Sequence, residues 1–103
     1  VEWERRMRRL ARHENLSVKL SGLTTLALPG PADRQRLQPF VDILFDAFGT
    51  SRVLFGSDWP VSTRATSYER TVELAREFVA DLTPAERAAV LAENSTRLYR
   101  LPA

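Results

Sequence analysis

The feature that most constrains this chain is a run of three apolar residues, Val53-Leu54-Phe55, with turn-forming residues on both sides. A short strand whose two alternating faces are both apolar is typical of a parallel sheet that is covered on both sides. Pro60 prevents further strand pairing soon afterwards, because proline has no amide hydrogen. The predicted strand therefore needs cover on both faces, and 103 residues supply only a few helices to provide it.

A second strand is predicted upstream, where residues Leu16 to Ser21 alternate between apolar and polar side chains. The apolar residues of this segment share one face. Its polar residues share the other face, namely Ser17, Lys19 and Ser21. Gly22 ends the run, and Leu23 to Asp33 is predicted to be a loop because proline and glycine interrupt it.

Apolar residues at helical spacing predict four helices around these strands. The first spans Glu2 to Arg12, and its row of arginines is interpreted either as a solvated face or as a surface for an anionic partner. The second starts by Pro39 and ends before Gly49. The last two begin at capping boxes. These are Thr66-x-x-Glu69, with the helix reaching about Asp81, and Thr83-Pro-Ala-Glu86, with a break expected at Asn94.

Composition limits the kinds of site that the chain can hold. It has no cysteine and one histidine, His13, so a thiolate site is excluded and a complete zinc centre is not expected within the chain. The net charge of +2 does not favour nucleic-acid binding, and no apolar run approaches the ~18–20 residues of a membrane helix. With no visible signal peptide and Val1 in place of Met, we expect a cytoplasmic protein and a piece of a longer chain.

Helices alternating with the two strands favour parallel pairing, and two strands alone make a poor sheet, so a larger layer or barrel is indicated. Ligands of such folds bind at the carboxyl ends of the strands, where Asp58 follows the second strand. Asp58 is interpreted as a general base, a metal ligand or a turn cap. Alternation along the strand would place it on the face of Leu54 and Gly56, and Trp59 beside it either lines a pocket or packs.

Two segments resemble the last two strands of the amidohydrolase superfamily, and specifically its amidohydrolase-related (family 2) group, which includes sugar-lactone and dicarboxylate-lactone hydrolases. They are Val18-Lys-Leu-Ser-Gly-Leu23 and Val53-Leu-Phe-Gly-Ser-Asp-Trp-Pro60. Residues 48–52 resemble the lead-in to the family's final strand, and residues 94–99 its C-terminal helix. The resemblance implies an α/β fold in which residues 1–103 form the C-terminal fragment of a (β/α)8 TIM barrel, carrying strands seven and eight with flanking helices.

The resemblance also implies roles for individual residues. Asp58 matches the strand-eight aspartate, which in the family orients or deprotonates the attacking water and often touches the metal. Trp59 and Ser21 match substrate-binding positions, with packing and loop hydrogen bonding as the alternatives. Lys19 needs a carboxylate such as Asp58 if its face points into the barrel, and otherwise extends into a solvent-filled mouth. His13 precedes its strand and is expected to be structural or exposed.

By this resemblance the complete enzyme is a hydrolase that opens a lactone with an activated water. A divalent, zinc-like metal is expected in the full-length enzyme and none on this chain alone, because the family's histidines after earlier strands have no counterpart here. The expected partners are a small-molecule substrate and the missing N-terminal strands, and the isolated chain is expected to be inactive. The alternatives are a decarboxylase or hydratase of the same superfamily, and a non-catalytic interaction fragment that uses its basic first helix.

Overall fold

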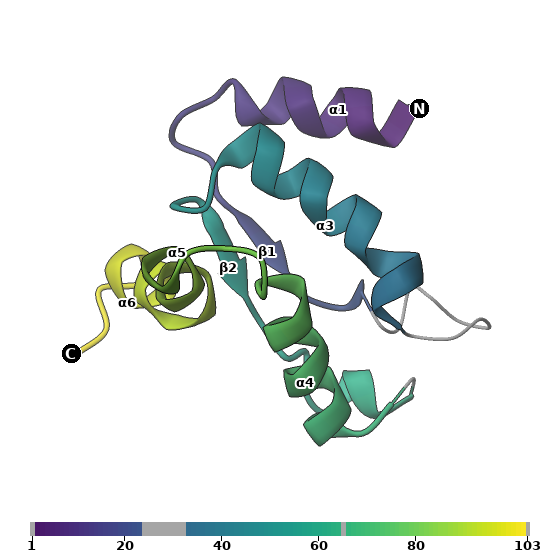
Figure 1. Ribbon diagram of the computed structural model, residues 1–103. Helices are drawn as coiled ribbons and strands as arrows, with labels where there is room; N and C mark the ends of the chain where they lie inside the picture. Colours follow the sequence, from purple (N-terminus) through teal and green to yellow (C-terminus); the bar gives the residue numbers. More distant parts are fainter. Residues whose placement is uncertain (1, 24–32, 65, 103) are drawn as a thin grey trace.

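A computed structural model describes residues 2–23, 33–64 and 66–102 (Figure 1). Two short parallel strands lie among helices that come from both ends of the chain. The elements in order are α1 (Glu2–Ala11), β1 (Val18–Leu20), α3 (Arg34–Phe48), β2 (Val53–Phe55), the 3₁₀ helix η1 (Val61–Arg64), α4 (Tyr68–Phe78), α5 (Pro84–Ala88), the π-helical turn η2 (Ala89–Glu93) and α6 (Asn94–Leu98). In the part of the chain that the structure describes, no helix has both the length and the apolar character needed to cross a membrane.

The two strands pair in parallel, as the sequence predicted. Val18 lies opposite Val53, and Leu20 lies opposite Phe55. One further backbone hydrogen bond, from the Gly56 N–H to the Leu20 carbonyl at 3.0 Å, extends the pairing past the end of β2. The carboxyl ends of both strands therefore reach the same edge of the sheet.

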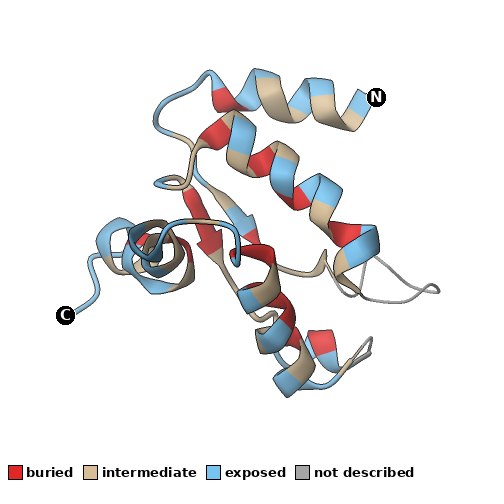
Figure 2. Ribbon diagram, in the orientation of Figure 1, coloured by how far each residue is buried: buried red, intermediate tan, exposed pale blue. Residues whose placement is uncertain are grey.

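The hydrophobic core lies on one face of this sheet. Val18, Leu20 and Val53 belong to an apolar cluster with residues of α1, α3, α4 and η2, and Figure 2 shows the buried stripes along α3 and α4. Leu54 is buried but lies outside that cluster. Because side chains alternate along a strand, Lys19 and Leu54, which are paired in register, point away from this core.

Helix α3 begins earlier than predicted. It starts at Arg34 rather than near Pro39, because Asp33 caps it by accepting the Arg36 N–H at 3.0 Å. Pro39 lies inside the helix, where it removes one backbone hydrogen bond. The end of α3 is as predicted: Gly49 follows it with φ 76°.

Helix α4 also differs from its prediction at both ends. Ser67, not Thr66, is its cap and accepts the Arg70 N–H at 3.1 Å, and the helix ends at Phe78 rather than near Asp81. The Thr83–Glu86 capping box is confirmed, and a π-helical turn immediately precedes Asn94, where a break was expected. Of the loop predicted over Leu23 to Asp33, residues 24–32 lie outside the described residues.

Arg52, directly before β2, joins the chain segments at the amino ends of both strands. Its guanidinium donates to four carbonyl oxygens, those of Ala11, His13, Leu16 and Phe48, over 2.9–3.1 Å. It also lies over the Phe48 ring, 5.2 Å from the centroid. The last carbonyls of helices are acceptors that cations satisfy well, so Arg52 holds the ends of α1 and α3 against the start of the sheet.

We expect Arg52→Met to lower the free energy of unfolding of the intact protein by about 2–4 kcal/mol, because several carbonyls lose a charged donor. Arg97→Met is the matched control, since exposed Arg97 donates to a single carbonyl among the described residues, that of Ser51 at 2.7 Å. Its loss is expected to stay below about 1.5 kcal/mol. Chemical denaturation of both variants measures the difference, and equal losses would contradict the role given to Arg52.

Candidate functional site

The carboxyl ends of β1 and β2 bring Asp58 against the Ser21–Gly22 turn. A β-carbon placed on Gly22 would lie 3.3 Å from Oδ2 of Asp58, so the carboxylate rests directly against this glycine. Gly22 has φ 76°, a conformation that favours glycine. The two strand ends that the sequence singled out separately are therefore neighbours in the structure.

Asp58 itself has a left-handed backbone, with φ 57°. Aspartate tolerates this conformation better than most residues, and the turn is closed by a hydrogen bond of 2.8 Å from the Ser62 N–H to the Asp58 carbonyl. Strand alternation consequently ends before Asp58, and the turn sets the direction of its side chain. The carboxylate is half-buried, and no hydrogen bond or ion pair joins it to another described residue.

Ser21 and Lys19 lie together across β2 because Gly56 has no side chain. A β-carbon on Gly56 would lie 3.3 Å from Oγ of Ser21 and 3.4 Å from Cε of Lys19. These two side chains therefore share the face that Gly56 leaves open. Asp58 follows Gly56 by two residues, in the turn at the same edge of the sheet.

The pairing of Lys19 with Asp58 that the sequence suggested is not formed. Within the described ranges no carboxylate lies within ion-pair distance of Lys19, whose Nζ is 5.9 Å from the centroid of the Tyr99 ring. Trp59 is 63% exposed, so it packs against little of this chain. His13 is exposed and precedes β1, and its backbone carbonyl accepts from Arg52.

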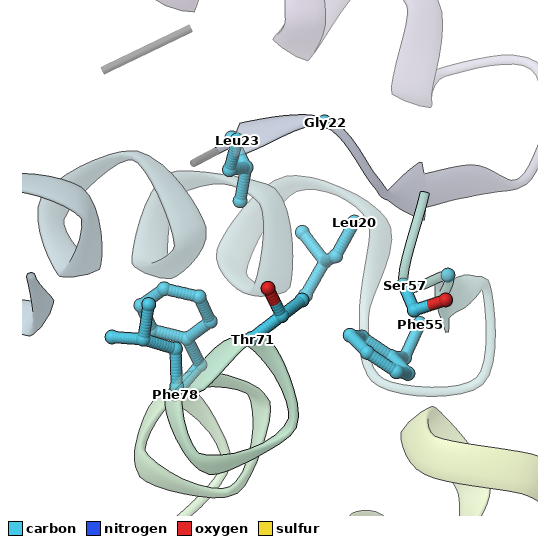
Figure 3. A pocket seen from close by; sticks show the side chains of 9 residues that line it. Leu20, Gly22, Leu23, Phe55, Ser57, Thr71 and Phe78 are labelled. Carbon is cyan, nitrogen blue, oxygen red and sulfur yellow. The ribbon is translucent and has the colours of Figure 1, made fainter. Parts of the chain in front are cut away.

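An apolar pocket lies at the same end of the sheet but on the side of α4 (Figure 3). Its walls combine both strand ends with the buried stripe of α4. They are Leu20, Gly22, Leu23, Phe55, Gly56, Ser57, Thr71, Leu74 and Phe78. None of Lys19, Ser21, Asp58 or Trp59 lines it.

Sequence reasoning missed the α4 wall of this pocket. The helix itself was predicted, but Thr71, Leu74 and Phe78 were not singled out, and all three are buried in the structure. The missed signal was the helical spacing of Thr71, Leu74 and Phe78, which share one face.

The donor set at the strand ends is small. Within residues 2–23, 33–64 and 66–102, no group of three or more His, Cys, Asp or Glu side chains could hold a metal ion. Asp58 supplies one carboxylate with free lone pairs, and a carboxylate oxygen is an acceptable ligand for zinc. Among the described residues, the strand ends offer the Asp58 carboxylate, the hydroxyls of Ser21 and Ser57, and the Lys19 ammonium.

Comparisons with known proteins give a consistent picture. A family model described as amidohydrolase matches residues 1–101. An L-fucono-1,5-lactonase of Burkholderia multivorans is 37% identical over 107 residues, and one of Burkholderia ambifaria is 43% identical over 103 residues. These matches cover 99% and 96% of this chain but only 36% and 35% of the relatives, so the chain spans about a third of their length.

Solved structures agree in fold. A crystal structure of an amidohydrolase from Burkholderia multivorans with bound zinc superposes with a TM-score of 0.90 at 36% identity. A second crystal form of an amidohydrolase from this organism, with bound HEPES, superposes with a TM-score of 0.91. Each match covers 97% of this chain and 37% of the other chain.

The contact between Gly22 and Asp58 can be tested by stability alone. Gly22→Ala places a β-carbon on a backbone with φ 76° and 3.3 Å from Oδ2 of Asp58, and it is expected to lose about 1–3 kcal/mol of unfolding free energy. The matched reference is the same change in an Asp58→Ala background, where the backbone cost stays and the carboxylate is gone. We expect chemical denaturation to give a smaller loss in that background than in the wild type, and equal losses would contradict the contact.

Proposed function

This chain belongs to the amidohydrolase family, and from that premise we propose that it forms strands seven and eight, with their helices, of a (β/α)8 barrel enzyme that hydrolyses a lactone. In this proposal β1 is strand seven and β2 is strand eight, and the rest of the barrel comes from outside this chain. The two lactonase relatives support a sugar lactone as the substrate class. The chain alone, with about a third of their length, is proposed to be inactive.

The observation that carries the proposal is the Asp58 carboxylate at the joined carboxyl ends of β1 and β2. Barrel enzymes place their chemistry at this end of the strands. A half-buried carboxylate without a partner among the described residues is free to accept a proton. An Asp that only stabilised its turn would be expected to accept backbone N–H groups nearby, and no such bond to its side chain is formed by the described residues.

We assign Asp58 the role of the base. A water molecule adds to the lactone carbonyl carbon while Asp58 accepts one of its protons, and the carbonyl oxygen takes up the electron pair as an oxyanion. The oxyanion then re-forms the carbonyl, the ring C–O bond breaks, and the leaving oxygen takes up the proton. The product is an open-chain hydroxy acid, which contains the atoms of the lactone and of one water molecule.

Asp58 is also the residue of this chain that would hold a divalent metal. Its carboxylate fits one zinc ligand, and the remaining ligands would have to come from outside the described residues. When bound, such an ion acidifies a water molecule and polarises a carbonyl group. The related crystal structure with bound zinc supports a zinc-like ion.

Trp59 and Ser21 are proposed to contact the substrate. Trp59 leaves most of its ring exposed at the edge of the sheet, where a flat apolar surface suits a sugar ring. The Ser21 hydroxyl lies on the open face above Gly56 and can donate to a substrate oxygen.

Decarboxylation, hydration and a non-catalytic role remain the alternatives, and the observations favour hydrolysis over each. The lactonase relatives favour hydrolysis within the family. An interaction role through α1 is weakened because three of the four arginines of this helix are paired: Arg5 and Arg6 with Glu2, and Arg8 with Glu4 and Asp46. These three have the character of a solvated, locally neutralised face.

We expect Asp58→Asn in the complete enzyme to lower turnover of L-fucono-1,5-lactone by about 100-fold or more, the usual scale for losing a general base. The melting temperature should change little, because the side chain has no hydrogen-bond partner among the described residues to lose. Asp42→Asn, which removes an exposed carboxylate on α3, is the control and should retain wild-type turnover. A lower melting temperature with near-normal turnover would assign Asp58 to capping instead.

A further inference from the structure

Lys19 is the one lysine of the chain, and the proposed mechanism gives it no task. It lies in β1 between Val18 and Leu20, both of which pack on the helical core. Its side chain therefore points to the other face, away from α1, α3 and α4. In a (β/α)8 barrel the helices form the outer ring, so the face away from them is the interior.

The path of the Lys19 side chain is made by Gly56. Cε of Lys19 lies 3.4 Å from where a β-carbon of Gly56 would be, beside Oγ of Ser21. A side chain at position 56 would meet both. The ammonium thus extends across β2 on the face of Ser21, at the edge of the sheet where Asp58 follows.

The Lys19 ammonium has no anion to pair with in the described part of the chain. Among the described residues, its ammonium lies over the ring of Tyr99, 5.9 Å from Nζ to the centroid, and an exposed cation–π contact contributes only about 0.5–1 kcal/mol. A ring does not neutralise the charge. Once the rest of a barrel encloses this face, an unpaired ammonium becomes costly, and an anion beside it becomes favourable.

We propose that Lys19 is a substrate-binding residue whose ammonium donates a hydrogen bond to the lactone carbonyl oxygen as that oxygen becomes an oxyanion. After the ring opens, the same ammonium binds the carboxylate of the hydroxy-acid product. This inference rests on the proposed hydrolysis and deepens it. The neutral lactone carries no charge for Lys19 to attract, whereas the tetrahedral intermediate and the product each carry one negative charge. A cation fixed at this place therefore stabilises the intermediate more than the substrate, which is what lowers the barrier.

The test compares binding with turnover in the complete enzyme. Lys19→Met is expected to lower kcat/KM for L-fucono-1,5-lactone by about 100-fold, the scale for removing one oxyanion donor. By calorimetry it should weaken binding of L-fuconate, the anionic product, by about 10-fold or more. Binding of a neutral ring analogue without the carbonyl should change less than about 2-fold, because it offers no charge to the ammonium.

Three further variants separate binding from structure. Lys19→Arg should recover part of the L-fuconate affinity, because it restores the charge. Arg12→Met removes an exposed cation beyond the end of α1, before β1 begins, and Tyr99→Leu removes the ring contact, and both should bind L-fuconate like the wild type. If Lys19→Met does not fold, Lys19→Gln replaces it with the same expectations.

The outcomes distinguish this inference from the proposed function. If the wild type binds L-fuconate but opens no lactone, the proposed hydrolysis fails, and the Lys19 variants still decide the anion site. The inference is overturned if Lys19→Met binds L-fuconate as tightly as the wild type. It is also overturned if Tyr99→Leu weakens binding equally, or if the wild type binds no L-fuconate.

Discussion

The register between β1 and β2 is the constraint on which the rest of the structure depends. Leu20 opposite Phe55 places the two carboxyl ends at one edge, where the Asp58 carboxylate reaches Gly22. Because side chains alternate along a strand, a slip of one residue would turn Lys19 into the core and Leu20 out of it. At the other end of the strands the register is held by Arg52. Its guanidinium donates to carbonyls at the end of α1 and in the turn that leads into β1.

The two faces of this small sheet have different tasks. One face carries Val18, Leu20 and Val53, which bury their side chains against the helices and stabilise the fold. The other carries Lys19 and Ser21 above the bare backbone of Gly56. Polar and charged side chains would be costly on the first face; in the proposed barrel they would be useful on the second, where an enclosed charge acts strongly on a reacting group. The apolar pocket beside α4 belongs to the packing side, because its walls are core residues such as Leu74 and Phe78.

Sequence patterns predicted the parts of this structure that depend on local chemistry. The two strands and their parallel pairing followed from alternation and order, and the Thr83 capping box from a short motif. The predicted start of α3, near Pro39, was too late. Asp33 caps a first turn that is mostly polar, and such a turn carries little hydrophobic signal. The approach of Asp58 to Gly22 and the path of Lys19 over Gly56 are contacts between distant segments. Such contacts depend on tertiary packing, which periodicity within one segment does not contain.

We propose that the substrate binds on the face of the sheet opposite α1, α3 and α4, at the carboxyl ends of β1 and β2. A crystal structure of the complete protein with L-fuconate bound tests this most directly. We expect the ligand carboxylate within hydrogen-bond distance of Lys19 Nζ, with the Asp58 carboxylate and the Ser21 hydroxyl lining the same cavity. Ligand bound instead in the apolar pocket between the strand ends and α4, with Lys19 and Asp58 both out of contact, would contradict it.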